Sequence, residues 1–188
     1  DPKPIASASI AQVHKAKLIE NNQIVAVKIL RPKIAKIVSR DILTLKIICF
    51  LTFNKYQKNK ITDIIKLLEI CSKKELDLLY EASCASKLKD SLKQVKGFYV
   101  PEIYWQYSSK NILVLEFING TPFSKPQQIK QTKHNHKQIA HNLVISYFTQ
   151  VYSNGFFHAD MHPGNLFLKE NGDIAVVDFG IMGNLSKK

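Results

Sequence analysis

Three polar residues near the C-terminal end of this chain, placed around two short apolar stretches, constrain its fold most. Asp160 and Asn165 are five positions apart, and Asp178 directly follows apolar residues 174–177. Residues 166–168 form the other apolar stretch, and the two together predict a hairpin that gathers the polar residues. Mg²⁺ takes hard oxygen ligands such as carboxylates and amides. Asn165 and Asp178 are therefore candidate Mg²⁺ ligands, and Asp160 is an acceptor placed to orient a hydroxyl group or a water molecule.

The apolar strand predicted at residues 24–30 carries a lysine, Lys28. Strand alternation puts Ala26, Lys28 and Leu30 on one face. A lysine in an apolar strand is costly unless an anion pairs with it; the alternative is an edge strand from which Lys28 points into water. Ala26 is small and leaves room for a flat ring. This face therefore fits a nucleotide that lies along the strand, with the Lys28 ammonium reaching its phosphates.

An acidic cluster at Glu75, Asp77 and Glu81 could supply the anion that Lys28 needs. We place all three residues on one predicted helix, where Asp77 and Glu81 are four positions apart and share a face. Such a cluster is usually a solvated helix face. With Lys28 available, Glu81 is the predicted ion-pair partner.

Hydrophobic periodicity predicts the remaining elements. The predicted helices are residues 34–45, a second helix that begins at Thr62-Asp63 after a polar break at 54–60 and continues to about residue 92, and residues 139–152, ended by Asn154-Gly155. The predicted strands are residues 10–18, 24–30, 99–107, 112–117, 166–168 and 174–177. The predicted irregular segments are loops at 1–9 and 125–137, a break at 120–122, and a type I′ turn at Asn171-Gly172.

Composition limits the class of protein. The chain has 188 residues, 45% of them hydrophobic, and a formal net charge of +12. These values predict one globular domain or a large piece of one. The three cysteines have no metal-binding spacing, so we predict reduced, mostly buried thiols. No apolar run in the sequence approaches the roughly 18 residues that a membrane-spanning helix needs.

The positive charge has two interpretations. Lysine is the common polar surface residue throughout the chain, which needs no partner, whereas a basic surface also attracts anionic membranes. The sequence has no arginine-rich helix, zinc-finger spacing or aromatic RNA-binding signature. We therefore expect no nucleic-acid partner.

His158, Asp160 and His162 raise a competing hypothesis, because a His-x-Asp-x-His sequence could hold the metal of a hydrolase. Such enzymes usually take further histidine ligands from other fixed positions. The other histidines show no such spacing: His14, His134, His136 and His141. We predict instead that the His158 ring packs beneath the loop and bonds to the backbone.

Taken together, these residues resemble the UbiB family of atypical protein-kinase-like proteins, and the similarity covers nearly the whole chain. Residues 4–14, PIASASIAQVH, are similar to the alanine-rich loop of that family, and Glu75-Leu76-Asp77 is similar to its Glu-x-Asp motif. Residues 158–165 and 178–183 are similar to its catalytic loop and its metal motif.

The resemblance implies a role for each site residue. Asp160 would be the catalytic acid of its loop, and Asn165 and Asp178 would bind Mg²⁺. Lys28 would pair with Glu81 and contact the phosphates. The nucleotide-binding residues that it implies are the loop residues Ala6, Ser7, Ala8 and Ser9, the strand residues Ala26 and Lys28, and the hinge residues Glu116 and Phe117.

The resemblance also implies an α+β, protein-kinase-like fold. Residues 1–118 would form an N-lobe with an antiparallel sheet, and residues 119–188 would form part of a C-lobe. ATP and Mg²⁺ would bind between the lobes. The chain looks cut at both ends: the Lys-x-Gly-Gln segment of the family would lie upstream of it, and further C-lobe helices would lie downstream.

The function that the resemblance implies is that of an atypical kinase or ATPase supporting ubiquinone biosynthesis, with ATP or ADP and Mg²⁺ as cofactors. Its partners would be ubiquinone-biosynthesis proteins and an anionic or quinone-bearing membrane surface. It would lie on the cytoplasmic side of an inner membrane, bound peripherally or anchored through segments outside this chain. The alternative function is that of a nucleotide-binding module, or an inactive fragment, without catalysis.

Overall fold

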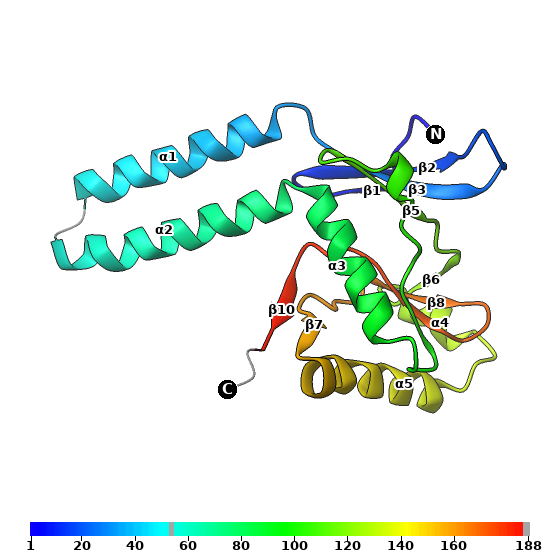
Figure 1. Ribbon diagram of the computed structural model, residues 1–188. Coiled ribbons are helices and arrows are strands. Elements are labelled where there is room, and N and C mark those ends of the chain that lie inside the picture. The colour runs from blue at the N-terminus through cyan, green and yellow to red at the C-terminus, as the bar shows by residue number, and fades with distance from the viewer. Residues whose placement is uncertain (53–54, 186–188) are drawn as a thin grey trace.

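The computed structural model describes residues 1–52 and 55–185, and it confirms the predicted α+β class. A first, antiparallel sheet has the strand order β1-β2-β3-β5 (Figure 1). Its strands are β1 (Ala6–Ser7), β2 (Ala11–Lys17), β3 (Ile24–Leu30) and β5 (Ile112–Glu116). β3 begins and ends where the alternation of the sequence predicted. Because β3 has a neighbour on each side, the hypothesis of an edge strand with a solvated Lys28 is wrong.

The register of this sheet fixes what surrounds Lys28. Val13 on β2 and Leu113 on β5 lie opposite it, and Ala26 faces Leu115. Residues opposite each other in a sheet project from the same face. Lys28 therefore shares its face with Val13 and Ala26, beside the buried leucines of β5.

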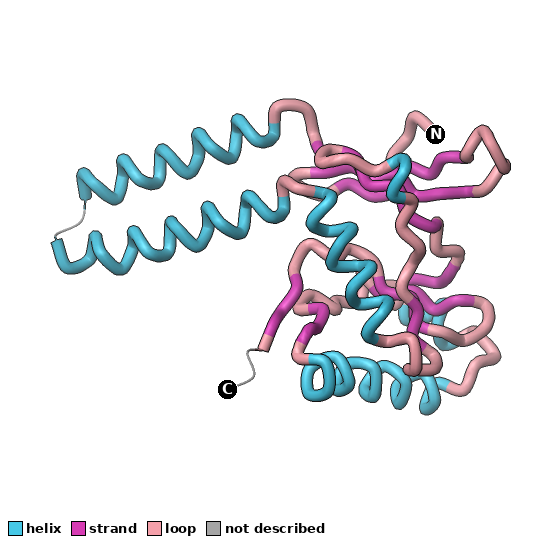
Figure 2. Tube along the Cα trace, in the orientation of Figure 1, coloured by secondary structure: helices cyan, strands magenta, loops and turns pink. Residues whose placement is uncertain are grey.

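Two long helices form a hairpin that projects away from both sheets (Figures 1 and 2). They are α1 (Ile34–Thr52) and α2 (Lys55–Glu75). The predicted polar break is wrong from Lys55 onward, and Thr62-Asp63 lies inside α2 rather than at its start; Asn54 lies outside the described residues. Segment 55–60 contains no glycine or proline and is rich in lysine, so helix propensity outweighs the lack of apolar periodicity.

The chain turns sharply between α2 and the third helix, α3 (Leu78–Ser91). Asp77 has extended backbone angles (φ −128°, ψ 94°), and its carboxylate accepts the N–H groups of Leu79 and Tyr80. It is an N-cap, so the predicted single helix across residues 75–81 is wrong. Glu75 ends α2, and Glu81 lies in the first turn of α3.

A second sheet has the order β4-β9-β8-β6. Its strands are β4 (Phe98–Tyr99), β6 (Gly120–Pro122), β8 (Leu166–Lys169) and β9 (Ile174–Val176). The predicted strand at 99–107 is mostly wrong, because Pro101 cannot donate to a sheet; residues Trp105–Tyr107 form a 3₁₀ turn. The predicted break at 120–122 is a strand, in which Gly120 permits close approach: a Cβ there would lie 2.7 Å from the Leu168 carbonyl oxygen.

The remaining elements lie beside this sheet. They are the helices α4 (Pro126–Lys130) and α5 (His136–Phe148), a π-helical extension (Thr149–Asn154), and the strand pair β7 (Phe156–His158) with β10 (Met182–Asn184). Gly155 ends the helix with φ 61°, as predicted. The predicted loop at 125–137 is wrong where α4 forms, with Pro126 in its first turn.

The turn between β8 and β9 differs from the predicted type I′ geometry. That turn needs positive φ at both central residues, and here Gly172 (φ 88°) has it but Asn171 does not. The Gly172 amide donates to the Lys169 carbonyl at 3.0 Å, so the β-turn of residues 169–172 ends at a left-handed glycine. The predicted hairpin itself is confirmed.

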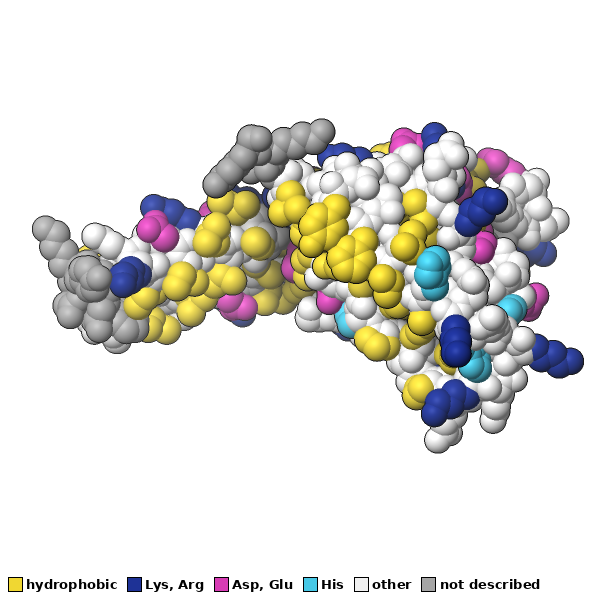
Figure 3. Space-filling model, turned by 90° about the horizontal axis from the view of Figure 1, so that it is seen from below, with side chains coloured by type: hydrophobic (Ala, Val, Ile, Leu, Met, Phe, Trp, Pro, Cys, Tyr) yellow, Lys and Arg dark blue, Asp and Glu magenta, His cyan; other side chains and the backbone are white. Residues whose placement is uncertain are grey.

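One core joins the two sheets. Its fully buried members include Leu88 of α3, Leu113 of β5, Ile174 of β9 and Phe179. Elsewhere apolar side chains are exposed along the α1–α2 hairpin and on α5. Figure 3, which shows the molecule from below, has hydrophobic side chains along this lower face. Within the described ranges, no helix has both the length and the apolar character needed to cross a bilayer. Cys49 and Cys84 are buried free thiols, and Cys71 is an exposed one.

The Asp77 cap yields a stability prediction. Asp77→Ala removes the acceptor of two α3 amides, so we expect the free energy of unfolding to fall by about 1 kcal/mol. Urea denaturation measures it. Asp77→Asn is the matched control, because an asparagine side chain caps as well as an aspartate. Equal losses in both variants would show that the negative charge, and not capping, matters here.

Candidate functional site

A mostly buried lysine, Lys28, links three segments that are distant in the sequence. The Lys28 Nζ donates to both oxygens of Glu81, at 2.8 and 2.9 Å, and to Asp178 Oδ1 at 2.8 Å. The Glu81 side chain is 6% exposed and that of Lys28 13%, whereas 47% of the Asp178 side chain is exposed. The predicted Lys28–Glu81 ion pair is therefore confirmed. The sequence did not predict that Lys28 would also bridge to Asp178.

Neighbouring charges favour the ionised forms of Lys28 and Asp178. Burial alone would lower the pKa of Lys28, but the charges of Glu81 and Asp178 outweigh it and raise that pKa. Burial would raise the pKa of Asp178, but the Lys28 ammonium outweighs it and lowers the pKa. The Glu81 carboxylate also accepts the Phe179 amide at 3.3 Å. Burial raises the pKa of Glu81, although the Lys28 ammonium opposes this shift. Asp178 is the more exposed of the two carboxylates.

The backbone at Asp178 adopts the left-handed conformation, with φ 65°. This conformation costs a non-glycine residue on the order of 1–2 kcal/mol, so surrounding contacts must hold it. The next side chain, Phe179, is fully buried. The Asp178 carbonyl accepts a hydrogen bond from His158 Nε2 at 2.8 Å. Fixed on both sides, the Asp178 carboxylate has a set position beside Lys28.

His158 connects the two loops of the site. Its ring is completely buried; Nε2–H donates to the Asp178 carbonyl, and Nδ1 accepts the Asp160 amide at 3.1 Å. The backbone amide of His158 donates to Gln150 Oε1 at 2.9 Å. This tautomer follows from the two partners. The predicted structural role is confirmed, and neither ring nitrogen is free to bind a metal, which removes the first ligand of the His-x-Asp-x-His hypothesis.

Asn165 lies between the other two polar residues of the site. Its side-chain Nδ2 donates to the Asp160 backbone carbonyl at 3.1 Å. Its backbone carbonyl accepts the Val177 amide at 2.9 Å. Its Oδ1 therefore remains an acceptor, which suits a metal ligand. Through these bonds and His158, the loop of residues 158–165 and the segment before Asp178 form one unit. In the described ranges no three His, Cys, Asp or Glu side chains form a metal cage, but Mg²⁺ usually uses one or two carboxylates together with phosphates.

The alanine-rich loop lies at the edge of the first sheet. Residues 1–9, predicted as loop throughout, contain the short strand β1, in which Ala6 pairs with Val13 and Ser7 with Gln12. Val13 in turn lies opposite Lys28. The loop is therefore one strand removed from the lysine, with exposed side chains.

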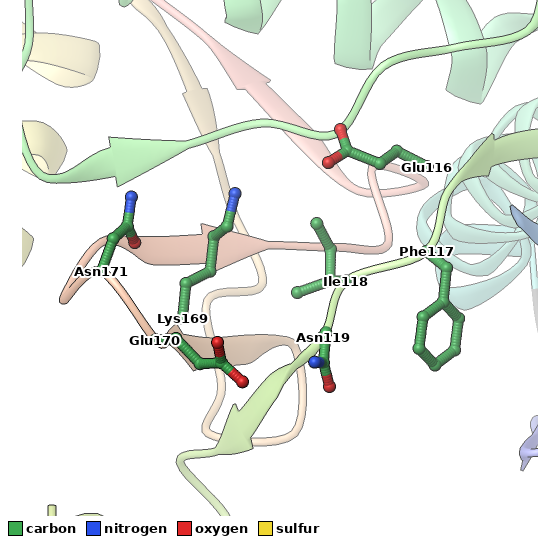
Figure 4. A pocket seen from close by; sticks show the side chains of 7 residues that line it. All are labelled: Glu116, Phe117, Ile118, Asn119, Lys169, Glu170 and Asn171. Atoms are coloured by element: carbon green, nitrogen blue, oxygen red, sulfur yellow. The ribbon is translucent and has the colours of Figure 1, made fainter. Parts of the chain in front are cut away.

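The predicted hinge residues border a hollow of about 280 Å³ after β5 (Figure 4). The Glu116 carboxylate accepts the Tyr99 hydroxyl at 2.5 Å and the Glu102 amide at 3.2 Å. Figure 4 shows the Phe117 ring directed away from Lys169, and the Lys15 ammonium lies 4.6 Å from the centre of that ring. The lining of this hollow includes neither Lys28 nor Asp178, so it is separate from the charged site.

Sequence reasoning missed several supporting groups. No local sequence pattern predicts the hydrogen-bond partners of the Phe179 amide, the Gln150 side chain and Tyr99. Glu75 and Asp77 do not belong to the Lys28 network; they mark the junction that orients α3, and with it Glu81.

Comparison with known proteins identifies the family of this chain. The whole chain, residues 1–188, matches the family model of the ABC1 atypical kinase-like domain. The chain belongs to this family. The ABC1 domain is similar in structure to Rv3197 of Mycobacterium tuberculosis, solved in complex with erythromycin, with a TM-score of 0.76 and 25% sequence identity. The match covers 98% of this chain and 46% of that protein, so the chain spans less than half of the solved relative.

The buried histidine of this ABC1 domain makes stability depend on pH. Burial lowers the pKa of His158 from its ordinary value of 6.5. Below that value the unfolded chain binds a proton that the folded chain does not, so stability is complete above about pH 6.5 and falls as the pH decreases toward the folded pKa.

We therefore expect urea denaturation to give a lower free energy of unfolding at pH 5.5 than at pH 7.5. One such histidine changes the free energy of unfolding by at most about 1.4 kcal/mol per pH unit. His158→Asn should be less stable at pH 7.5 and should lose part of this slope. The exposed His162 supplies the control variant His162→Asn. An unchanged slope in His158→Asn would show that another group causes the pH dependence.

Proposed function

We propose that this ABC1 domain binds ATP with Mg²⁺ and catalyses phosphoryl chemistry, as an atypical kinase or an ATPase. One observation carries the proposal: a mostly buried ammonium, Lys28, contacts an exposed carboxylate, Asp178, which the backbone and His158 hold in place. A partly accessible cation beside a fixed carboxylate suits a phosphate–metal pair better than a closed structural ion pair.

The residues present fit both groups. Lys28 would bind phosphate oxygens, while Glu81 keeps the lysine in place through both of its own oxygens. Asn165 Oδ1 and the Asp178 carboxylate would hold Mg²⁺, which supplies charge neutralisation for the phosphates. Asp160, bonded to Asn165 through its carbonyl, would orient the attacking hydroxyl or water.

The adenine position is proposed from the sheet. Ala26 lies on the same face as Lys28 and carries a side chain small enough for a flat ring to rest against it. The segment after β5, with Glu116 and Phe117, would border the base. Because the Glu116 carboxylate is already bonded to Tyr99 and Glu102, backbone groups would make that contact. The loop residues Ala6 to Ser9 would cover the phosphates.

Within the ABC1 family we propose a UbiB-type role in ubiquinone biosynthesis. The support is the sequence of residues 4–14, the Glu75-Leu76-Asp77 triplet and the segments 158–165 and 178–183. The partners proposed with it are other ubiquinone-biosynthesis proteins and an anionic or quinone-bearing membrane surface, on the cytoplasmic side of an inner membrane. Because the chain spans 46% of the solved relative, these properties belong to the whole protein.

Nucleotide binding is tested first. Asp178→Asn keeps the size of the side chain but removes its charge, and we expect Mg²⁺-dependent ATP affinity to fall at least about tenfold. Isothermal titration with and without Mg²⁺ measures it. Asp173→Asn, in the exposed turn before β9, is the matched control. Lys28→Ala should also weaken binding, once circular dichroism shows that it folds. Unchanged affinity in both Asp178→Asn and Lys28→Ala would falsify the site.

Catalysis is tested separately, because a nucleotide-binding module would share the same contacts. In a single-turnover experiment we expect ATP hydrolysis above background, and Asp160→Asn should reduce its rate about 10²- to 10⁴-fold with little change in affinity. Asp90→Asn, on α3, is the control. Tight binding with only background hydrolysis in the unsubstituted protein would favour the binding module.

A further inference from the structure

Arg31, the residue after β3, holds the alanine-rich loop through its side chain and its backbone. Its Nη2 donates to Ser7 Oγ at 2.7 Å and to the Ala8 carbonyl at 3.1 Å, and its Nε donates to the same carbonyl at 3.2 Å. The Arg31 amide donates to the Ile10 carbonyl at 2.8 Å. One residue therefore fixes the loop on both sides of Ser9.

Between these fixed points the loop offers hydrogen-bond donors. The Ala8 amide donates to the Ala11 carbonyl at 2.9 Å. Within the described part of the chain, the amides of Ser9 and Ile10 donate to no protein acceptor. Consecutive free backbone amides in a turn form a binding site for phosphate-type anions. They lie in the loop between β1 and β2, and β2 pairs with the strand that carries Lys28.

We propose that Arg31 is a positioning residue, which fixes this loop so that the Ser9 and Ile10 amides face the phosphates of a bound nucleotide. The inference rests on the proposed nucleotide binding, and it adds Arg31 to the residues that serve this site. Alanine and serine allow a loop less conformational freedom than glycine does. A stiff loop adapts poorly to its ligand, so its position has to be set beforehand.

The chemistry of the guanidinium explains why an arginine suits this position. Its rigid planar fork reaches the hydroxyl of Ser7 and the carbonyl of Ala8 at once, whereas a lysine ammonium at the end of a flexible chain does not hold two acceptors in fixed geometry. Arg31→Lys therefore keeps the charge and removes the fork. Ser7→Ala removes one acceptor and leaves the other.

The experiment compares Arg31→Lys and Ser7→Ala with the unsubstituted protein and with Arg40→Lys. Arg40 is an exposed residue of α1 that approaches Asp41 at 3.9 Å, so it is a charge-matched control. Three quantities are measured: amide hydrogen exchange of residues 6–10 without nucleotide, the Kd for ATP with Mg²⁺, and kcat at saturating ATP.

For Arg31→Lys we expect faster exchange of the loop, a Kd raised about five- to tenfold, and kcat changed less than about twofold. Ser7→Ala should give a smaller rise in Kd, about two- to threefold. Arg40→Lys should change neither quantity. A raised Kd with unchanged kcat separates a positioned binding loop from general destabilisation of the fold.

Each other outcome overturns the inference. Unchanged exchange and unchanged Kd in Arg31→Lys would show that Arg31 does not hold the loop. Faster exchange with unchanged Kd would show that the loop needs no positioning. A raised Kd with unchanged exchange would make Arg31 a direct phosphate contact. If the unsubstituted protein itself binds no nucleotide, the proposed function fails, and the positioning role fails with it. If the unsubstituted protein binds nucleotide and only the Arg31→Lys results differ from those expected, the positioning role alone fails.

Discussion

The structure depends on the ion pairs that the Lys28 ammonium makes with Glu81 and Asp178. The lysine lies on a central strand, and only 13% of its side chain is exposed. Glu81 and Asp178 come to it from positions 53 and 150 residues away in the sequence. Removing one member of a buried pair costs about 3–5 kcal/mol, because the other is left as an uncompensated charge. This requirement fixes α3 against the first sheet and Asp178 against both.

The two carboxylates of this network have different surroundings. Glu81 is enclosed, uses both oxygens on Lys28 and accepts the Phe179 amide. Asp178 is half exposed and is held by its backbone. A nucleotide with its metal could therefore engage Asp178 while Glu81 keeps the lysine in place. His158 extends the same rigidity to Asp160, because a single buried ring bonds to the backbone of both loops.

Local sequence patterns predicted elements well where a run or period of apolar residues marked a strand or a helix. The alternation across residues 24–30 and the helical stripe that became α5 are examples, as are the hairpin of β8 and β9 and the buried His158. Prediction failed where polar residues belong to regular structure. Residues 55–60 are helical despite their polarity, and Asp77 starts a helix instead of lying within one. At residues 55–60 helix propensity outweighs the missing apolar period, and at Asp77 the carboxylate bonds to the first amides of α3.

The sequence by itself determined which chemical groups are available and in what order: a strand lysine, a helix glutamate, and an Asp, an Asn and an Asp around a hairpin. It also determined the periodicity of most elements, because strand and helix geometry is set by neighbours within a few residues. Only the tertiary structure decided that Lys28 bridges two carboxylates, that Asp178 stays partly exposed, and that Arg31 reaches back to Ser7 and Ala8. Contacts across such distances in the chain depend on how whole elements pack, and no local pattern records that packing.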